Sequence, residues 1–285
     1  MKSLKVLARA KINLNLYVLN KREDNYHNIK SIFHKIDLYD ELTLTKSNTF
    51  KLNSNINTLN NESNIIYKAY KKLKELYPSI KGVEVSLKKT IPMQAGLGGG
   101  STDCASFLLA MNDLYNLNLT KKELENIGSS LGADVVPCLY DVPLLAEGIG
   151  ERVTPIDSNL NFYSLIIKPN MSCSTKEMYE KIDDNKEPII DNTDIIIEGL
   201  KTNNIELISN NLYNSFEQAV DNQNLINKIK KELQDNGAIA SLMTGSGSCI
   251  FGLFKTKEQA TIAYDKLKEQ YEIYICSSYN KKHTN

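Results

Sequence analysis

The sequence predicts an α+β fold of two domains, and three observations lead to that prediction. The chain has 285 residues, which is long for one compact domain and comfortable for two. Some segments alternate apolar and polar residues as strands do, and others repeat apolar residues at helical spacing. Both kinds are mixed along the chain, so we expect helices on one side of antiparallel sheets. A polar stretch at 157–160 predicts domains 1–156 and 157–285.

The first strand is predicted near the N-terminus. Apolar residues at positions 12, 14, 16 and 18 alternate with residues 11, 13, 15 and 17. This period of two indicates a half-buried strand with Lys11 and Asn13 on its polar face. More strand-like sequence covers about 29–44, and the Asn/Ser-rich residues 47–62 are expected to form a loop.

A helix and a strand are predicted next. Apolar residues recur at helical spacing from Ile65 to Leu76, and Pro78 ends the helix. Residues 83–87 alternate as a strand. Residues 101–114 favour a helix, and Thr120 with Glu123 forms a capping box that opens another through 131.

The C-terminal part contains the same two kinds of pattern. A strand is predicted at 163–167, and Ser174 with Glu177 marks a helix start. Helices are expected around 201–219 and 222–236. The tail predicts strands at 239–243 and 249–254, a helix from Thr256 and a strand at 272–277.

Composition limits the class of partner. Lys+Arg and Asp+Glu both number 34, so no overall charge attracts nucleic acid or an anionic membrane. The five cysteines are widely spaced without a C-x-x-C pair, and no cluster has metal-ligand spacing. Charged residues interrupt the apolar N-terminus, and no apolar run could span a bilayer. We therefore expect a cytoplasmic protein with a small-molecule ligand and no nucleic-acid or membrane partner.

A glycine-rich segment links the 83–87 strand to the following helix, and it reads Pro92, Met93, Gln94, Ala95, Gly96, Leu97, Gly98, Gly99, Gly100, Ser101 and Thr102. Glycine lets the backbone approach a ligand, so that several N–H groups can converge on one point. The helix N-terminus adds N–H donors and partial positive charge, which suit phosphates. The two hydroxyls could contact a phosphate oxygen or Mg²⁺. We predict the phosphate-binding loop of an ATP-dependent small-molecule kinase.

The two most familiar glycine motifs do not fit this segment. G-x-x-x-x-G-K-[ST] is absent because the chain has no Gly-Lys pair. G-x-G-x-x-G fails because Ser101 stands at its last glycine. A plain surface turn would need only one or two glycines, so the four found here favour a ligand-binding loop.

The segment resembles the phosphate loop of the GHMP kinases, P-x-x-x-G-L-[GS]-[GS]-[GS]-[SA]. Other blocks typical of that family follow in family order: A-K-I-N-L-x-L-x-V at 10–18, R-x-D-G-Y-H at 22–27, G-[AS]-D-V at 132–135, A-x-G-x-G-E at 146–151 and G-S-G-S at 245–248. Asn25 stands where the family has glycine, and asparagine tolerates the left-handed conformation better than most residues. Asp141-Val142 replaces a common Gly-Gly pair, which leaves the local backbone path open.

The resemblance implies a GHMP-kinase-like fold and a reaction. It implies an N-terminal nucleotide-binding domain and a C-terminal ferredoxin-like α/β domain, with the active site between them. The implied reaction moves the γ-phosphoryl group of ATP, with Mg²⁺, to the 2-hydroxyl of cytidine diphosphate methylerythritol. This step belongs to non-mevalonate isoprenoid precursor biosynthesis. The expected state is a monomer or weak homodimer.

The resemblance also implies a catalytic pair, Lys11 and Asp134. Asp134 would take the proton of the acceptor hydroxyl, and the Lys11 ammonium would keep the carboxylate ionised. Taken one by one, the residues alone favour a helix-capping aspartate and a solvated lysine.

Substrate contacts are implied for Asn13, Tyr26, His27 and Tyr179. Tyr26 and His27 would recognise cytosine by stacking and hydrogen bonding, with Tyr179 as a second aromatic face. The segment Gly245, Ser246 and Gly247, followed by Ser248, is implied to close near the phosphates, although a tight hairpin explains it equally.

Two alternatives remain open at this point. Another GHMP kinase, of the homoserine or mevalonate type, would keep the glycine loop without needing the Tyr26-His27 pair. A non-catalytic binding module on the same fold, contacting RNA, is disfavoured by the balanced charge.

Overall fold

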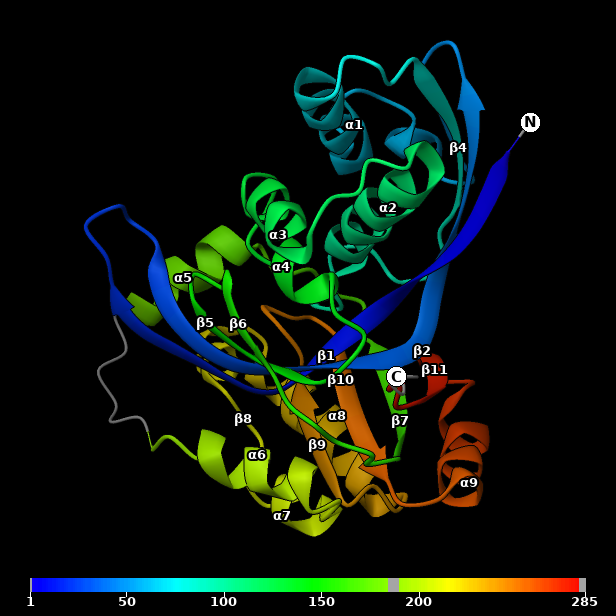
Figure 1. Ribbon diagram of the computed structural model, residues 1–285. Helices are drawn as coiled ribbons and strands as arrows, with labels where there is room; N and C mark the ends of the chain where they lie inside the picture. Colours follow the sequence, from blue (N-terminus) through cyan, green and yellow to red (C-terminus); the bar gives the residue numbers. More distant parts are fainter. Residues whose placement is uncertain (1, 184–189, 282–285) are drawn as a thin grey trace. The chain divides into compact units, whose positions relative to one another are not determined.

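The computed structural model describes residues 2–183 and 190–281, and the chain forms two compact units (Figure 1). Unit 1 comprises Met1–Ala10, Leu38–Met93 and Gly98–Leu139, and unit 2 comprises Lys11–Asp37, Gln94–Leu97 and Tyr140–Asn285. Two long strands, β1 (Ser3–Lys21) and β2 (His27–Ser47), contribute residues to both units. The units therefore are not separated at one point of the sequence, and the bounds 1–156 and 157–285 stay a prediction.

Unit 1 combines helices with part of the sheet that contains β1 and β2. Strand β4 (Gly82–Lys88) pairs antiparallel with the 41–47 part of β2 and parallel with β3 (Lys51–Ser54). The helices are α1 (Ile65–Leu76), α2 (Gly99–Tyr115), α3 (Lys121–Ser129) and α4 (Val135–Cys138). Helices α1 and α2 pack against each other (Figure 1). The expected helix at 65–76, the strand at 83–87 and the Thr120–Glu123 capping box are confirmed.

Unit 2 contains an antiparallel sheet in the order β11-β7-β10-β9. Its strands are β7 (Tyr163–Lys168), β9 (Ala240–Met243), β10 (Ile250–Phe254) and β11 (Glu272–Ser277). Helices α8 (Gln223–Asp235) and α9 (Lys257–Leu267) pack on this sheet (Figure 1). Their apolar sides join one buried cluster with the sheet, which includes Leu165, Ile229 and Ala263.

The remaining elements of unit 2 surround the long strands. Strand β5 (Leu144–Gly148) pairs antiparallel with β2 and with β6 (Arg152–Pro155), and β8 (Tyr213–Asn214) pairs parallel with β1. The helices are α5 (Thr175–Asp183), α6 (Thr193–Lys201) and α7 (Ile205–Ser209), followed by the 3₁₀ turn η2 (Ser215–Ala219). The α+β class is confirmed, but the expectation of purely antiparallel sheets is wrong for the β1–β8 and β3–β4 pairs.

Two expectations about local structure are wrong. Residues 47–62 are not all loop, because β3 and a 3₁₀ turn, η1 (Asn57–Leu59), lie within them. The polar composition hides β3 because it contains no fully buried residue. Residues 201–219 are not one helix, since asparagines interrupt them: Asn203 has a φ of 56°, and Asn214 caps η2.

The expectation that β1 is half-buried is also wrong. Lys11, Asn13 and Asn15 have exposed fractions of 4, 0 and 0%. Their polar groups are satisfied by distant residues, as in the bond from Asn15 Nδ2 to Thr193 Oγ1 at 2.8 Å. Both faces of this strand are therefore covered, and its polar residues are held by hydrogen bonds inside the protein, as buried polar groups require.

His34 on β2 is a fully buried histidine. Its Nδ1 donates to the Lys35 carbonyl at 2.8 Å, and its ring meets Phe162 edge-on. Its Nε2 has no hydrogen-bond partner among residues 2–183 and 190–281. Burial therefore lowers the pKa of His34 from 6.5 to about 4, since a charged imidazolium would lose its hydration there.

This pKa predicts a loss of stability in mild acid. Between pH 6.5 and 4 the unfolded chain binds the His34 proton and the folded chain does not, so the free energy of unfolding falls as pH decreases. The expected loss from this group is about 3 kcal/mol across that window. Urea denaturation of the wild type and of His34→Gln between pH 7 and 4 measures it. An equally steep pH dependence in the variant would contradict the assignment.

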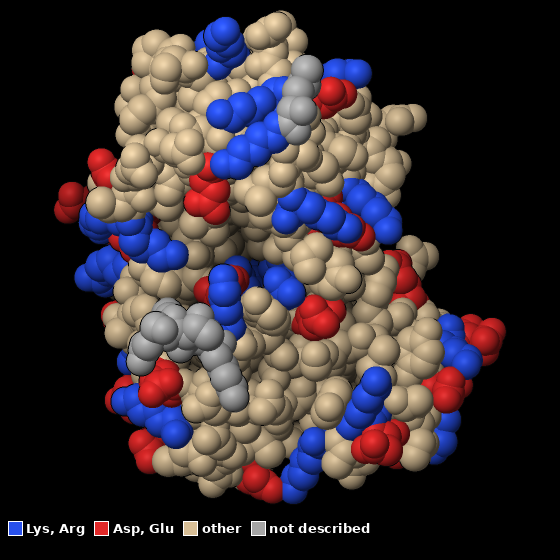
Figure 2. All heavy atoms as spheres, turned by 45° about the vertical axis from the view of Figure 1, so that its right-hand side comes forward, with Lys and Arg blue, Asp and Glu red and all other residues tan. Residues whose placement is uncertain are grey.

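No helix in the described part of the chain is long and apolar enough to cross a membrane. On the face in Figure 2, Lys and Arg side chains are interspersed with Asp and Glu.

Candidate active site

The glycine-rich segment forms a loop that ends at the start of α2. Pro92 is half-buried and Met93 is exposed, while Ala95 and Leu97 are buried and anchor the loop. Gly98 is the N-cap of α2 and adopts the left-handed conformation with a φ of 69°. The first helical bond runs from Thr102 N to Gly98 O at 2.8 Å.

The start of α2 has the properties of a phosphate site. The first residues of the helix, Gly99 and Gly100, carry no side chains that could cover its N-terminal N–H groups, and the Ser101 hydroxyl is half-buried. The N–H groups of a helix's first turn have no partner within the helix and attract anions. The arrangement can therefore bind a phosphate chain, as the sequence predicts.

In unit 2, the 94–97 part of this loop packs directly on the 245–248 turn. Backbone bonds run from Cys249 N to Ala95 O at 3.1 Å and from Lys11 N to Leu97 O at 3.0 Å. A Cβ on Gly96 would overlap the Thr244 carbonyl, and one on Gly245 would lie 2.7 Å from the Gly96 oxygen. Only glycine allows this close backbone approach.

The 245–248 turn joins β9 to β10, which pair antiparallel. Gly245 and Gly247 are left-handed, with φ of 56° and 88°. The Ser246 hydroxyl lies 2.8 Å from Thr175 Oγ1, and Ser248 Oγ donates to the Met171 carbonyl. The hairpin interpretation is thus confirmed, and the position of the turn near the phosphates stays a prediction.

Lys11 is buried rather than solvated. Its ammonium donates to Asn13 Oδ1 at 2.7 Å and lies 4.8 Å from the centre of the Phe33 ring. The Asn13 carboxamide also accepts from Gly245 N at 3.0 Å, and its Nδ2 donates to Ser31 Oγ at 2.8 Å. Burying an ammonium costs free energy of desolvation, and this cost favours a functional role for Lys11. Asn13 links Lys11 to the 245–248 turn, and its contact with substrate stays a prediction.

Asp134 precedes α4 in unit 1, at the N-cap position. Its side chain accepts no capping hydrogen bond from the described α4, and the residue is half-buried. The capping interpretation of Asp134 is therefore not supported. Lys11 belongs to unit 2 and Asp134 to unit 1, so their pairing stays a prediction.

The Tyr26–His27 block lies at the turn between β1 and β2. Tyr26 is 57% exposed, which leaves an aromatic face for a flat base. His27 is buried, its ring stacks on Tyr179 with centroids 5.0 Å apart, and Nε2 donates to Asp183 Oδ1 at 2.6 Å. Hydrogen bonds from Lys21 and His27 lower the pKa of Asp183.

These contacts refine the expected substrate-binding residues. The structure brings His27 and Tyr179 together, and Tyr179 also meets Phe216 edge-on. Asp183, which fixes the His27 ring, was not predicted, because it lies 156 positions further along the chain and carries no local motif. The tight turn also bears out the interpretation of Asn25, which has a φ of 67°.

Asp141, which with Val142 departs from the family pattern, is held by an ion pair. Asp141 Oδ1 lies 2.8 Å from the Lys35 ammonium, and the Asp141 carbonyl accepts from Lys281 N. In the following A-x-G-x-G-E block, the Glu151 carboxylate accepts from Ile149 N at 2.7 Å. The backbone path through this block is thus held by local contacts.

A buried ion-pair cluster beside the phosphate loop was missed by sequence reasoning. Lys89, which lies just before this loop, is buried. Its ammonium contacts Asp40 and donates to Asp103 Oδ2 at 2.7 Å, with side-chain exposures of 4, 0 and 5% for the three residues. Asp103 lies on α2 directly after Thr102, among apolar residues. This charged residue in an apolar setting was the sequence signal that could have indicated a buried ion pair.

Comparisons with known proteins agree with this fold. The GHMP kinases N terminal domain model matches residues 64–142, and the GHMP kinases C terminal model matches 196–273. A solved homoserine kinase from Cytophaga hutchinsonii has a TM-score of 0.76 at 22% identity over 99% of this chain and 96% of that one, which shows the fold alone. The chain is a member of the GHMP kinases, and it is an ATP-dependent small-molecule kinase.

Individual relatives define a narrower family. A 4-diphosphocytidyl-2-C-methyl-D-erythritol kinase of Clostridium botulinum (strain Alaska E43 / Type E3) is 41% identical over 93% of this chain and 96% of its own. One of Clostridioides difficile (strain 630) is 39% identical over 98% of this chain and 96% of its own. A crystal structure of 4-(cytidine 5'-diphospho)-2C-methyl-D-erythritol kinase has a TM-score of 0.83 at 28% identity, over 98% of this chain and 100% of that one. The chain belongs to the 4-diphosphocytidyl-2-C-methyl-D-erythritol kinase family.

Proposed function

We propose that the protein transfers the γ-phosphoryl group of ATP to the 2-hydroxyl of 4-diphosphocytidyl-2-C-methyl-D-erythritol, in non-mevalonate isoprenoid precursor biosynthesis. The products are ADP and the 2-phosphate. The observation that carries this proposal is the family membership over nearly the whole chain, at about 40% identity. The blocks at 10–18, 22–27 and 132–135 place candidate substrate and catalytic residues on the elements described above.

The chain's own residues suggest how the reaction proceeds. The N–H groups of the glycine loop and of the α2 N-terminus hold the phosphates. The Asp134 carboxylate accepts the proton of the 2-hydroxyl as its oxygen bonds to the γ-phosphorus and the bond to ADP breaks. Lys11 supplies positive charge beside this group. Tyr26 provides a stacking face for cytosine, and His27 is oriented by Asp183.

Mg²⁺ would neutralise phosphate charge when bound. Its ligands would be phosphate oxygens and a hydroxyl at the start of α2, since Mg²⁺ takes oxygen ligands and needs few from protein. The residues present fit this role: Ser101 is half-buried there, and Thr102 Oγ1 is buried without a hydrogen-bond partner in the described chain. Residues 2–183 and 190–281 contain no group of three His, Cys, Asp or Glu that could hold a metal.

The test is ADP release with ATP·Mg²⁺ across a panel of acceptors. We expect turnover with 4-diphosphocytidyl-2-C-methyl-D-erythritol, and at least a hundredfold lower kcat/KM with homoserine and mevalonate, because a site built for a polar ligand discriminates by about this factor or more. Activity on homoserine and none on the cytidyl substrate would refute the proposed acceptor. A monomer or weak homodimer and a cytoplasmic location stay predictions.

The second candidate function, an RNA-binding module, has no supporting observation. The charges on the face in Figure 2 are mixed in sign, whereas RNA-binding surfaces gather Lys and Arg. ATP turnover that disappears in the Asp134 variant described below would exclude this alternative.

A further inference from the structure

Asn214 is the last residue of β8, a strand of two residues. It pairs with Leu16 of β1. The residue is 2% exposed. Its Nδ2 donates to Met243 O at 2.7 Å and to Gly245 O at 2.9 Å. Both hydrogens of this amide are thus used to hold the backbone on either side of Thr244, where the 245–248 turn begins.

The other end of the same carboxamide is also engaged. Asn214 Oδ1 accepts from Phe216 N at 2.9 Å and so caps η2. The turn is therefore tied to η2 through one side chain. From the opposite side, Asn13 Oδ1 accepts from Gly245 N at 3.0 Å. Gly245 is held at both its N–H and its carbonyl.

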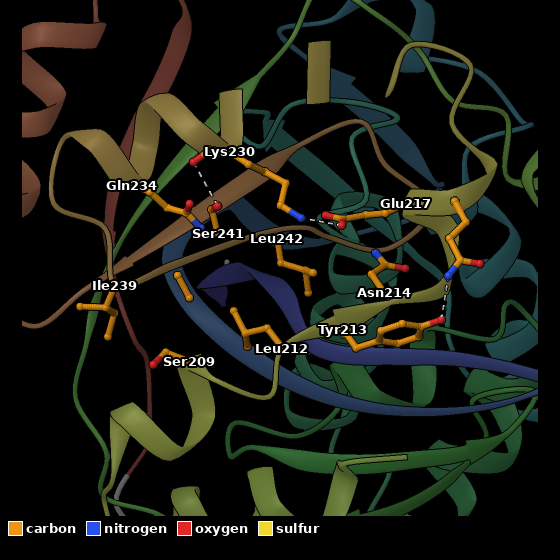
Figure 3. Close-up of a pocket in the computed structure, with 12 residues that line it drawn as sticks. Ser209, Leu212, Tyr213, Asn214, Glu217, Lys230, Gln234, Ile239, Ser241 and Leu242 are labelled. Carbon is orange, nitrogen blue, oxygen red and sulfur yellow. Dashed lines mark hydrogen bonds and ion pairs between the residues drawn. The ribbon is translucent and has the colours of Figure 1, made fainter. Parts of the chain in front are cut away.

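Glu217 on η2 adds a second tether. Its Oε1 accepts from Met243 N at 2.7 Å, and its Oε2 forms an ion pair with the Lys230 ammonium at 2.6 Å. Figure 3 shows this ion pair beside Asn214 in a pocket of about 270 Å³ that all three residues line. The N–H and the carbonyl of Met243 are therefore both bound by side chains of the 214–217 segment.

We propose that Asn214 and Glu217 are positioning residues for the phosphoryl transfer. They contact neither the phosphates nor the acceptor. They fix the backbone of the 245–248 turn, which packs on Ala95, Gly96 and Asn13. Displacing a group beside the reacting phosphate by about 1 Å can cost a hundredfold in rate. The proposal rests on the proposed function only in assuming that this turn lies beside the transferred phosphate.

The first test is Asn214→Asp. The carboxylate retains an acceptor for Phe216 N but loses both N–H donors, so the cap survives and the two tethers to the turn do not. The expected result is a fall in kcat, per folded protein, of about tenfold to a hundredfold, with the KM of the acceptor unchanged. The matched control is Asn222→Asp, since Asn222 caps α8 only by accepting from Leu225 N, and its kcat should equal that of the wild type.

The second test uses Glu217, which is only partly buried, so that its variants are easier to accommodate in the fold. It tests the proposal even when Asn214→Asp does not fold. Glu217→Gln retains an oxygen acceptor for Met243 N, whereas Glu217→Met removes it. We expect kcat to fall about tenfold in the Met variant and to stay within about twofold of the wild type in the Gln variant. A purely structural role would move the urea midpoint and kcat together in both variants.

The results separate this proposal from the proposed function. The ratios of kcat are measured with whichever acceptor of the panel the wild type phosphorylates, so a wrong acceptor does not affect them. A kcat for folded Asn214→Asp within twofold of the wild type would overturn the proposal. So would equal kcat values for Glu217→Gln and Glu217→Met.

Discussion

In the variant Asp134→Asn, kcat is expected to fall by about a thousandfold, within the range typical for loss of a general base. The amide has the size of the carboxylate but cannot take the proton of the acceptor hydroxyl. ATP affinity should be unchanged, because the glycine loop and the start of α2, which carry the phosphate-binding N–H groups, are not altered.

The loss of a helix cap does not complicate the interpretation of this variant. Asp134 stands at the N-cap position of α4, but its side chain accepts no capping bond from the described helix. An N-cap aspartate that did so would contribute about 1 kcal/mol to stability, and its loss would confuse the kinetics. The thermal midpoint then shows separately from kcat whether the substitution affects folding.

The measurement is ADP release under saturating ATP, together with nucleotide binding by calorimetry and the thermal midpoint. Asp113→Asn is the matched control, because Asp113 lies on an exposed part of α2 near its C-terminal end. It should keep full activity. Turnover in Asp134→Asn equal to that of the control would remove Asp134 from the catalytic pair.

Elements whose signals are local could be predicted from the sequence. Helix α1 begins after Asn64, which accepts from Ile66 N, and α3 begins with the reciprocal Thr120–Glu123 box. Each signal lies within a few residues of the helix that it starts. The glycine loop is equally local, because its phosphate-binding character depends on a strand, four glycines and a helix start in succession.

Features that depend on distant partners could not be predicted. The alternation in β1 gave the correct strand but the wrong exposure, since Asn13 and Asn15 are covered by residues far along the chain. Long-range hydrogen bonds leave no periodic trace in the sequence. The same reason hid Asp183 beside His27 and the tethers of Asn214, whose partner Met243 lies 29 positions away.

The Lys11–Asp134 pair shows what the family blocks added. From single residues, a solvated lysine was a better interpretation than a catalytic one. Burial of Lys11 at 4% exposure contradicts the solvated interpretation, and the absence of a cap bond at Asp134 weakens the structural one. The proposed roles therefore gain physical support from observations that the sequence did not contain.

Replacement of Lys89 with methionine is expected to lower the free energy of unfolding by about 3–5 kcal/mol, as is typical when one partner of a buried ion pair is lost. The variant leaves the carboxylates of Asp40 and Asp103 buried without their shared cation. Asp40 Oδ1 is further committed to Thr90 N and Ile91 N, at 2.5 and 2.9 Å. The cluster cannot simply open to water.

The titration of Asp103 sharpens this expectation. Burial raises the pKa of Asp103, whereas the Lys89 ammonium opposes the increase and Asp40 adds to it. Without Lys89, Asp103 becomes easier to protonate, and a neutral acid is less costly to bury. The folded variant therefore keeps the Asp103 proton to a higher pH than the folded wild type does. Its deficit relative to the wild type should therefore grow from pH 5 to pH 8.

Urea denaturation of Lys89→Met at pH 5 and pH 8 tests both statements. The neighbouring Lys88→Met is the control, because Lys88 has a side-chain exposure of 69% and lies 3.5 Å from Glu41, and such surface pairs contribute little. Equal stability of the two variants would show that the cluster does not hold this region together. The phosphate site should weaken with it, because the Lys89 ammonium lies close to the start of α2, where it would be 3.3 Å from a Cβ on Gly99. A displaced helix start no longer directs its N–H groups at the phosphates.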